Sequence, residues 1–387
     1  LLMRIDNANI YHRGKFFLGS IRWEAKTITA IGEKVEPIIG EESFDAELMY
    51  LVPGFIDVHT HGGDHLDINH VGSISDIDDL SLFFASKGIT GFLASVVTDT
   101  KERTEEILRT LSSAIAKGTA GSELLGIHLE GPFISCEYKG AMPKELLLDG
   151  DADLLEHYLS VADNNVLYLT VAPELPGVIP LIRKYKDRLV IAIGHSGADY
   201  ETSMAAIEAG ATSCTHIFNA MKLFHMHRPA ITGAALESDI YCEAICDGFH
   251  LVPATVRLLL KTKGYDKVVA ITDSIMAAGL PAGLYKLGTM DVEVLDGDAK
   301  LLNGVRAGST LTMDKALVNL MAFTGKSLEQ VLPLMTENPA RMLNLYETKG
   351  SLEIGKDADF TLLGPTLQIE RTYVRGNLAY AGRGKIE

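Results

Sequence analysis

The sequence predicts an α/β fold: a (β/α)8 TIM-like barrel with a small β-sandwich domain built from both termini. Two observations lead to this prediction. Through the middle of the chain, eight apolar strand-like runs alternate with amphipathic helical patterns. The two ends carry short alternating runs broken by turn residues, which are typical of antiparallel strands.

Each predicted barrel strand is a short apolar run bounded by turn or helix signals, as buried parallel strands are. An open doubly wound sheet is the alternative. The regular repeat and the lack of a glycine-rich dinucleotide loop argue against it. The eight runs are 55–61, 89–97, 124–132, 166–174, 189–196, 212–220, 240–248 and 268–274.

Helices are predicted between most of these strands. Residues 73–87 and 101–117 have acidic first turns and a glycine after the last turn, as helices prefer. An inserted hairpin is expected at 285–306, after the last barrel strand. Further helices are expected at 202–209, 253–263, 314–323 and 327–342.

The two terminal segments are each too short to form an ample core alone. One small domain built from both is therefore the economical interpretation. We assign residues 1–51 and 350–387 to this β domain and residues 52–349 to a catalytic barrel. A length of 387 residues suits one large domain with a smaller one.

Composition limits the partners of this chain. The formal charge is −16, from 35 Lys and Arg against 51 Asp and Glu, which disfavours nucleic acid and anionic membranes. An anionic small molecule would need a local basic site.

No apolar run approaches the ~18 residues of a membrane helix, and the first residues lack a secretory signal pattern. Cys136, Cys214, Cys242 and Cys246 have no disulfide or zinc-ribbon spacing. We therefore expect a cytoplasmic protein.

His59 and His61 end the first predicted strand, just before two glycines. Side chains alternate along a strand, so both imidazoles point the same way and suit a metal ion. In a barrel all strand ends open onto one face, where active sites are found. Later strand ends add Glu130, His195, His216 and Asp273.

Taken singly, each of these groups could be a loop carboxylate, a cap or a core histidine. Taken together they are better explained as a site, because ionisable groups seldom lie in apolar strands without a partner or a role. Imidazole and carboxylate donors accept Zn, Fe, Mn or Co. The sequence does not select among these divalent metals.

The same motifs carry a resemblance to known proteins. PGFIDVHTHG at the first strand, GHS, THIFNAM and ITDS are similar to the amidohydrolase superfamily. Within it, HLEGPF, KGAMP, DGFH and ITDSIMAAGLPAG resemble the N-acetylglucosamine-6-phosphate deacetylase family. The resemblance covers essentially the whole chain. HxH alone marks only the superfamily, whereas HLEGP with THIFNAM is far more specific.

This resemblance implies a hydrolase with one or two divalent metal ions. Glu130, His195 and His216 correspond to the ligands of the primary metal. His59 and His61 match the pair of two-metal members, with Glu130 bridging.

Asp273 matches the catalytic carboxylate and completes the set of metal-site residues. The family chemistry implies that the metal lowers the pKa of bound water toward ~7. Asp273 takes a proton as hydroxide attacks the acetamide carbonyl of N-acetylglucosamine 6-phosphate, and then protonates the departing amine. The expected products are glucosamine 6-phosphate and acetate.

The resemblance also implies a substrate-binding set. Asn219 and Ala220 match a clamp on the phosphate, and His250 matches a histidine that contacts it. The remaining residues expected to bind substrate are Gly140, Ala141, Met142 and Leu311.

Two positions depart from the family pattern. Met142 stands where single-metal members have a histidine that polarises the acetyl carbonyl, and a thioether cannot donate a hydrogen bond. We expect a second metal on His59 and His61 to do this instead. At the phosphate-binding arginine position this chain has His227, with Arg228 beside it. In the family that residue reaches the neighbouring subunit, which implies a homodimer; a solvated loop is the alternative.

Other functions remain open. The chain could act on a related sugar phosphate, such as N-acetylgalactosamine 6-phosphate. It could be another amidase of the superfamily, although paired-metal members of that kind usually use a carboxylated lysine where this chain has Glu130. A non-catalytic scaffold barrel would have lost metal-binding groups, and all six are present.

Overall fold

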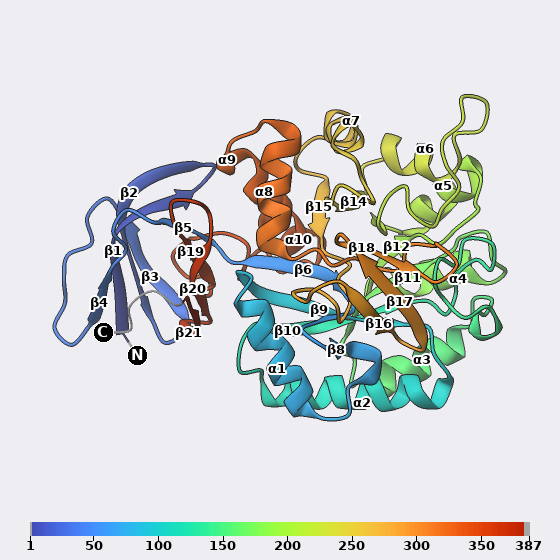
Figure 1. Cartoon of the computed structure of the whole chain (residues 1–387), viewed down its shortest axis with the longest axis horizontal. Helices are drawn as coiled ribbons and strands as arrows, with labels where there is room; N and C mark the ends of the chain where they lie inside the picture. Colours follow the sequence, from blue (N-terminus) through green and yellow to red (C-terminus); the bar gives the residue numbers. More distant parts are fainter. Residues whose placement is uncertain (1, 383–387) are drawn as a thin grey trace.

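The computed structural model describes residues 2–382. An all-β part that holds both ends of the chain lies beside a larger barrel (Figure 1). The limits predicted for the small domain include Leu1 and residues 383–387, which lie outside the described range. Within that range no helix combines the length and the apolar character needed to cross a membrane.

Eight parallel strands form the barrel, and their order in the sheet follows the chain. All eight coincide with predicted runs, which confirms the fold class. Two backbone hydrogen bonds lie outside the regular strand pairing: Asp273 N donates to His59 O at 2.8 Å, and His61 N donates to Ser274 O at 2.7 Å. These two bonds join the first and last strand ends and so close the barrel at the predicted site. The strands are β6 (Phe55–Thr60), β9 (Ile89–Val97), β10 (Glu123–Glu130), β11 (Val166–Val171), β12 (Val190–Ile193), β13 (Ser213–Cys214), β14 (Tyr241–Ile245) and β15 (Val268–Ile271).

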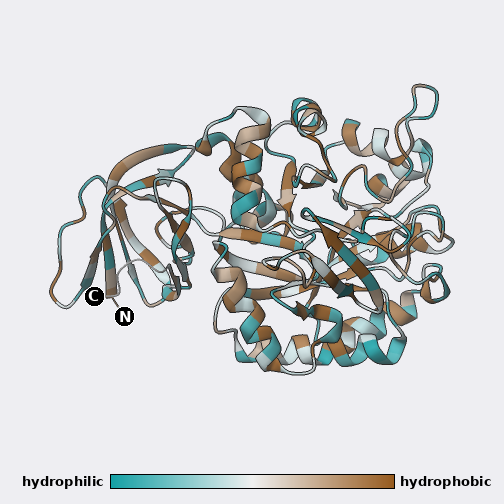
Figure 2. Ribbon diagram, viewed as in Figure 1, coloured by the Kyte–Doolittle hydropathy of each residue, from teal (hydrophilic) through white to brown (hydrophobic). Residues whose placement is uncertain are grey.

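The barrel strands are covered on both faces. Every residue of β6 and β9 is buried. Brown, apolar strands lie inside helices that carry teal, polar positions (Figure 2). Side chains fill the interior of such a barrel and helices cover its outside. This double burial explains why the strands are continuous apolar runs rather than alternating patterns.

Helices connect the strands on the outside of the barrel. At the start of α2 (Lys101–Lys117), the Thr100 side chain accepts a hydrogen bond from Arg103 N. The helix ends at Gly118, whose φ of 82° suits a residue without Cβ. The sequence did not predict α3, α4 and α6. The other helices are α1 (Ile74–Ala85), α3 (Ala152–Val161), α4 (Val178–Tyr185), α5 (Tyr200–Ala209), α6 (Ala230–Glu237), α7 (Pro253–Lys263) and α8 (Met313–Thr324), with 3-10 turns η1 (Ile68–His70) and η2 (Lys144–Leu146).

The single helix predicted over 327–342 is wrong. Pro333 has no backbone N–H and cannot continue a helical ladder. The chain instead forms three short pieces, of which the second and third contact strands β6 and β15. They are α9 (Leu328–Val331), the 3-10 helix η3 (Leu332–Met335) and α10 (Glu337–Met342).

The insertion after the last barrel strand has three strands rather than the two of the predicted hairpin. Leu295 pairs with Asp298, so the second turn contains only Asp296 and Gly297. Both have positive φ, 51° and 87°, as an Asp-Gly hairpin turn requires. This antiparallel sheet, called the hairpin sheet below, lies in front of the barrel in Figure 1. It consists of β16 (Gly283–Leu287), β17 (Met290–Leu295) and β18 (Asp298–Leu301).

The small β part is built from both ends of the chain, as predicted. Trp23 packs against Phe360 and Tyr373, with ring centroids 5.1 and 5.3 Å away. Its indole Nε1 donates to Gly376 O at 2.9 Å, which ties the two ends together. A two-stranded ribbon, β7 (Gly62–Gly63) and β8 (Leu66–Asp67), follows β6. The strands of the small part are β1 (Leu2–His12), β2 (Lys15–Glu24), β3 (Thr27–Gly32), β4 (Glu42–Asp45), β5 (Tyr50–Pro53), β19 (Phe360–Leu363), β20 (Ile369–Val374) and β21 (Asn377–Ala381).

Candidate metal centre

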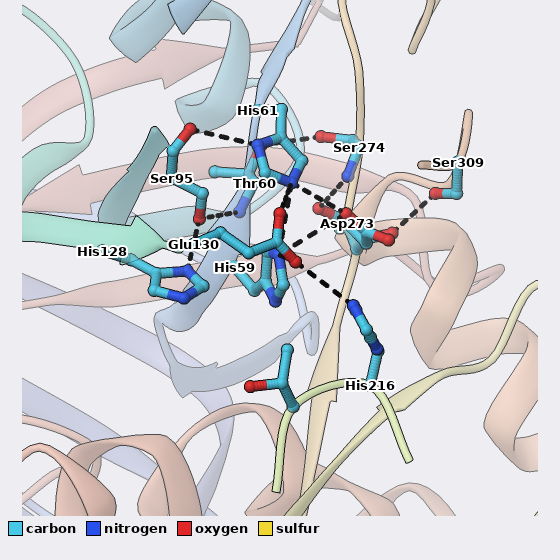
Figure 3. Close-up of polar contacts among 12 residues, drawn as sticks. His59, Thr60, His61, Ser95, His128, Glu130, His216, Asp273, Ser274 and Ser309 are labelled. Atoms are coloured by element: carbon cyan, nitrogen blue, oxygen red, sulfur yellow. Dashed lines mark hydrogen bonds and ion pairs between the residues drawn. The ribbon is translucent and has the colours of Figure 1, made fainter. Parts of the chain in front are cut away.

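Four histidine side chains from three strand ends converge on one buried region, part of which is shown in Figure 3. His195 Nε2 lies 3.0 Å from His216 Nε2, and His59 Nε2 lies 3.2 Å from His61 Nε2. Nitrogens bound at 2.0–2.1 Å to one tetrahedral metal ion would be about 3.3 Å apart. The two histidine pairs therefore have the spacing of ligands that share a cation.

Glu130 lies between the two histidine pairs. Its Oε1 is 3.1 Å from His195 Nε2, 3.2 Å from His216 Nε2 and 3.3 Å from His59 Nε2. Its Oε2 is 3.4 Å from His61 Nε2. Two potential metal-binding groups result, and Glu130 belongs to both. This is the geometry that a bridging carboxylate requires.

The far side of each imidazole shows which nitrogen is free to bind a metal. His61 Nδ1 lies 3.1 Å from Ser95 O, and His195 Nδ1 lies 2.9 Å from Tyr138 O. A carbonyl can only accept, so both Nδ1 atoms carry the proton and donate it. The Nε2 lone pairs then face the cluster, which is the arrangement found for metal-binding histidines. The donor set fits a divalent metal.

Asp273 completes the cluster from the last barrel strand. Its Oδ1 lies 3.1 Å from His61 Nε2 and 3.6 Å from His59 Nε2. Three of these residues, His195, His216 and Asp273, have φ values of 45°, 25° and 49°. Such left-handed backbone costs about 1–3 kcal/mol for a residue with Cβ and is concentrated at functional sites. Here it turns the chain so that the side chains enter the barrel mouth.

The electrostatics of the cluster favour ionised carboxylates. Burial by itself raises the pKa of Glu130, but the charge of His59 and hydrogen bonding to His195 bring that pKa well below its ordinary value. Burial likewise opposes ionisation of Asp273, and His59 and His61 lower its pKa. Both carboxyl groups therefore present negative charge to the cavity.

Glu243, which the sequence did not single out, supports the cluster from below. It is fully buried in β14, and its Oε2 lies 3.0 Å from both His59 Nδ1 and His216 N. Its Oε1 accepts a hydrogen bond from Tyr168 OH at 2.6 Å. A clue was present in the sequence, because a glutamate inside an apolar strand needs a partner.

His128, which shares the HLEGP motif with Glu130, is a core histidine. Its Nδ1 lies 2.9 Å from Ser95 Oγ and its Nε2 lies 2.8 Å from Thr170 Oγ1. Burial lowers the pKa of His128 well below its ordinary value, so the ring is neutral. With both nitrogens engaged, His128 is not available as a metal ligand.

A cavity of about 220 Å³ opens onto the metal centre. It brings together six of the residues predicted to bind substrate with most of the predicted metal ligands. The hairpin sheet and the segment after it form another wall, which the sequence did not predict. The predicted substrate residues in the lining are Gly140, Ala141, Met142, Asn219, Ala220 and His250; the other lining residues are His61, Glu130, His195, His216, Asp273, Leu287, Val305, Arg306, Ala307 and Gly308.

Three predicted substrate residues do not line this cavity in the single chain. His227 and Arg228 lie on an exposed loop before α6. Leu311 is buried in the core beneath the site. The roles given to these residues stay predictions. Arg306 is the charged cavity residue that sequence reasoning missed; it lies after β18, at the end of the predicted inserted hairpin, where no residue was expected to bind substrate.

A parallel eight-stranded barrel with histidines and carboxylates gathered at its strand ends defines a metal-dependent hydrolase of the barrel type. The chain belongs to the amidohydrolase family, whose model matches residues 50–379. It is 37% identical over 338 residues to an N-acetylglucosamine-6-phosphate deacetylase of Bacillus subtilis, covering 86% of this chain and 85% of the relative.

Two further relatives bear on the substrate. An N-acetylgalactosamine-6-phosphate deacetylase of Escherichia coli is 33% identical over 349 residues, covering 89% of this chain and 91% of the relative. The fold matches a mutant N-acetyl-D-glucosamine-6-phosphate deacetylase of Mycobacterium smegmatis in complex with N-acetyl-D-glucosamine-6-phosphate. That match has a TM-score of 0.90 and 28% identity, and covers 98% of this chain and 99% of that one.

Proposed function

We propose that this chain hydrolyses the acetamide of N-acetylglucosamine 6-phosphate to glucosamine 6-phosphate and acetate, a step of amino-sugar catabolism. One observation carries the proposal. Asp273 lies 3.1 Å from His61 at the floor of a cavity whose walls include Asn219, Ala220 and His250. A proton-transfer group and the predicted phosphate-binding residues thus face the same space.

Glu130, His195 and His216 would hold the primary divalent ion, and His59 and His61 with Glu130 a second one. Such an ion, when bound, is a Lewis acid that lowers the pKa of water and polarises a carbonyl. The donors accept Zn, Fe, Mn or Co, and availability decides among them.

Asp273 performs the proton transfers in this proposal. Its lowered pKa keeps it ionised in the resting chain, ready to accept a proton from the attacking water. The same oxygen then returns the proton to the amine nitrogen as the C–N bond breaks. Asn219, Ala220 and His250 hold the phosphate, which fixes the acetamide against Asp273.

The test is acetate release from N-acetylglucosamine 6-phosphate and from its galactosamine epimer. The metal-free protein is reloaded separately with Zn, Fe, Mn and Co. We expect release from the glucosamine compound with at least one metal. The Escherichia coli relative makes the epimer the second candidate, and a higher kcat/KM for it would reassign the substrate. No release from either compound with any metal would overturn the proposal.

The role of the second metal has its own test. Met142 lines the cavity and cannot donate a hydrogen bond to the acetyl oxygen. The double variant His59→Ala with His61→Ala should therefore lose deacetylation. His157→Ala is the matched control, because this exposed histidine pairs with Glu105 away from the site. Activity retained in the double variant would remove the second metal from the mechanism.

We also propose a cytoplasmic homodimer. All four cysteines are free thiols, as is usual in a reducing compartment. His227 and Arg228 lie on an exposed loop, where one of them can reach the phosphate site of a partner subunit. Light scattering of the protein as it elutes from a size-exclusion column measures its molar mass. A monomeric mass would exclude this contact.

A further inference from the structure

We infer that Arg306, beside the hairpin sheet, is a phosphate-binding residue supplied by the same chain as the metal centre. This inference rests on the proposed function, because it concerns the anionic end of the proposed substrate. It adds a residue that was not predicted from the motifs. It also gives this chain a guanidinium at the site in spite of His227 at the family's arginine position.

The cavity offers a phosphate group little fixed positive charge from its own side chains. The chain has a formal charge of −16, and the cavity itself contains Glu130 and Asp273. A phosphate monoester brings further negative charge into this space. Among the described residues that line the cavity, Arg306 is the one lysine or arginine. It is therefore the residue best placed to offset the phosphate charge within one chain.

Arg306 is held in place while part of its guanidinium stays free. Its Nε and Nη2 donate to the two carboxylate oxygens of Asp298, at 2.9 and 3.1 Å. Nη1 makes no hydrogen bond to any described residue. The bidentate pair fixes the plane of the group, so a phosphate oxygen meets an oriented donor rather than a mobile side chain.

The Arg306–Asp298 pair lies next to the predicted phosphate histidine. Gly297, the neighbour of Asp298, approaches the ring of Phe249: a Cβ on this glycine would lie 3.6 Å from it. His250 follows in the chain, and its Nδ1 lies 2.7 Å from Asp247 Oδ2. His250 and Arg306 both line the cavity. A phosphate between them would contact an imidazole on one side and a guanidinium on the other.

The experiment compares Arg306→Met with the parent on N-acetylglucosamine 6-phosphate and on unphosphorylated N-acetylglucosamine. A hydrogen bond to a charged group corresponds to about 10- to 100-fold in binding. We expect KM for the phosphorylated substrate to rise about 10- to 100-fold with little change in kcat. The kcat/KM for the unphosphorylated sugar should not change. Arg306→Lys should recover part of the loss, because it restores charge without the planar fork.

Lys300→Met is the matched control. Lys300 pairs with the same Asp298 but does not line the cavity, so this variant should keep the parent KM. The inference is overturned if Arg306→Met keeps the parent KM, or if it weakens both substrates equally. It is also overturned if Arg228→Met or His227→Ala raises KM while Arg306→Met does not, since the phosphate would then be held by the exposed loop.

A binding measurement separates this inference from the proposed function. Calorimetric titration with glucosamine 6-phosphate and with glucosamine needs no turnover. Weaker binding of the phosphorylated compound alone in Arg306→Met supports the inference even if the parent releases no acetate. Equal binding by parent and variant overturns it even if the parent is an active deacetylase.

Discussion

The metal centre and a second cluster between the two domains both gather carboxylate or histidine donors within 4.8 Å of one another. The second cluster consists of Glu123, Asp357 and Asp359. Lys349 lies in its middle, with Nζ 2.6 Å from Glu123 and from Asp359 and 3.3 Å from Asp357. We call these four residues the lysine cluster.

The difference between the two clusters is the source of positive charge. Burial lowers the pKa of Lys349, but Asp359 and Glu123 raise it above its ordinary value, so the lysine stays charged. At the metal centre, Glu130 and Asp273 pair only with histidines among the described residues. A lysine that stays charged closes its cluster to a metal ion, whereas the imidazoles of the metal centre can release their protons and bind one.

Removal of metal should have the largest effect. It should act on the metal centre and leave the lysine cluster unchanged. Dialysis against a chelator is expected to abolish acetate release, and reloading should restore it. The melting temperature should also fall, because an ion at 100 times its Kd stabilises the fold by about 2.7 kcal/mol. Elemental analysis before and after dialysis checks the loading. Unchanged activity in a protein shown to be metal-free would mean that the metal centre needs no external cation, which would contradict this difference between the two clusters.

Asp273→Asn is expected to lower kcat by about 10²- to 10⁴-fold, the usual contribution of a positioned general acid–base group. Steady-state kinetics with the phosphorylated substrate measure it. The matched variant in the lysine cluster is Asp359→Asn, which should keep its kcat per folded molecule. If both variants lose kcat equally, the metal centre has no special place in the chemistry.

Lys349→Met should destabilise the fold by about 3–5 kcal/mol, because it leaves buried carboxylates without their partner. Urea unfolding measures the change in the free energy of unfolding. Lys26→Met is the control: Lys26 also pairs with Asp357, at 3.6 Å, but its side chain is 53% exposed. An exposed pair contributes about 0–1 kcal/mol. Equal effects would show that burial does not distinguish these two lysines.

Glu243→Ala should weaken metal binding at His59 and His61 by about 10- to 100-fold, the usual cost of losing a residue that orients a ligand. Competition with a chromogenic chelator measures the affinity. Tyr168→Phe removes only the hydrogen bond from Tyr168 OH to Glu243 and leaves the contacts of Glu243 with His59 and His216. A loss of affinity in both variants would mean that the effect comes from the barrel interior in general.

Much of the site could be predicted because its signals are local. His59 and His61 are two residues apart on a strand, and Glu130, His195, His216 and Asp273 each end an apolar run. The family prediction is confirmed by relatives that match most of the chain. The prediction of one helix over 327–342 is wrong for an equally local reason, because Pro333 cannot continue a helical hydrogen-bond ladder.

By itself, then, the sequence determined the barrel, the shared terminal domain and the residues that could bind metal, because strand period, helix signals and motifs depend on near neighbours. Only the tertiary structure decided what supports those residues. Glu243 reaches His59 from 184 positions away. Arg306 enters the cavity from the end of the inserted sheet, and Lys349 meets Glu123 between two domains. Such pairs exist only once barrel closure and domain packing bring distant segments together, and no local pattern records that geometry.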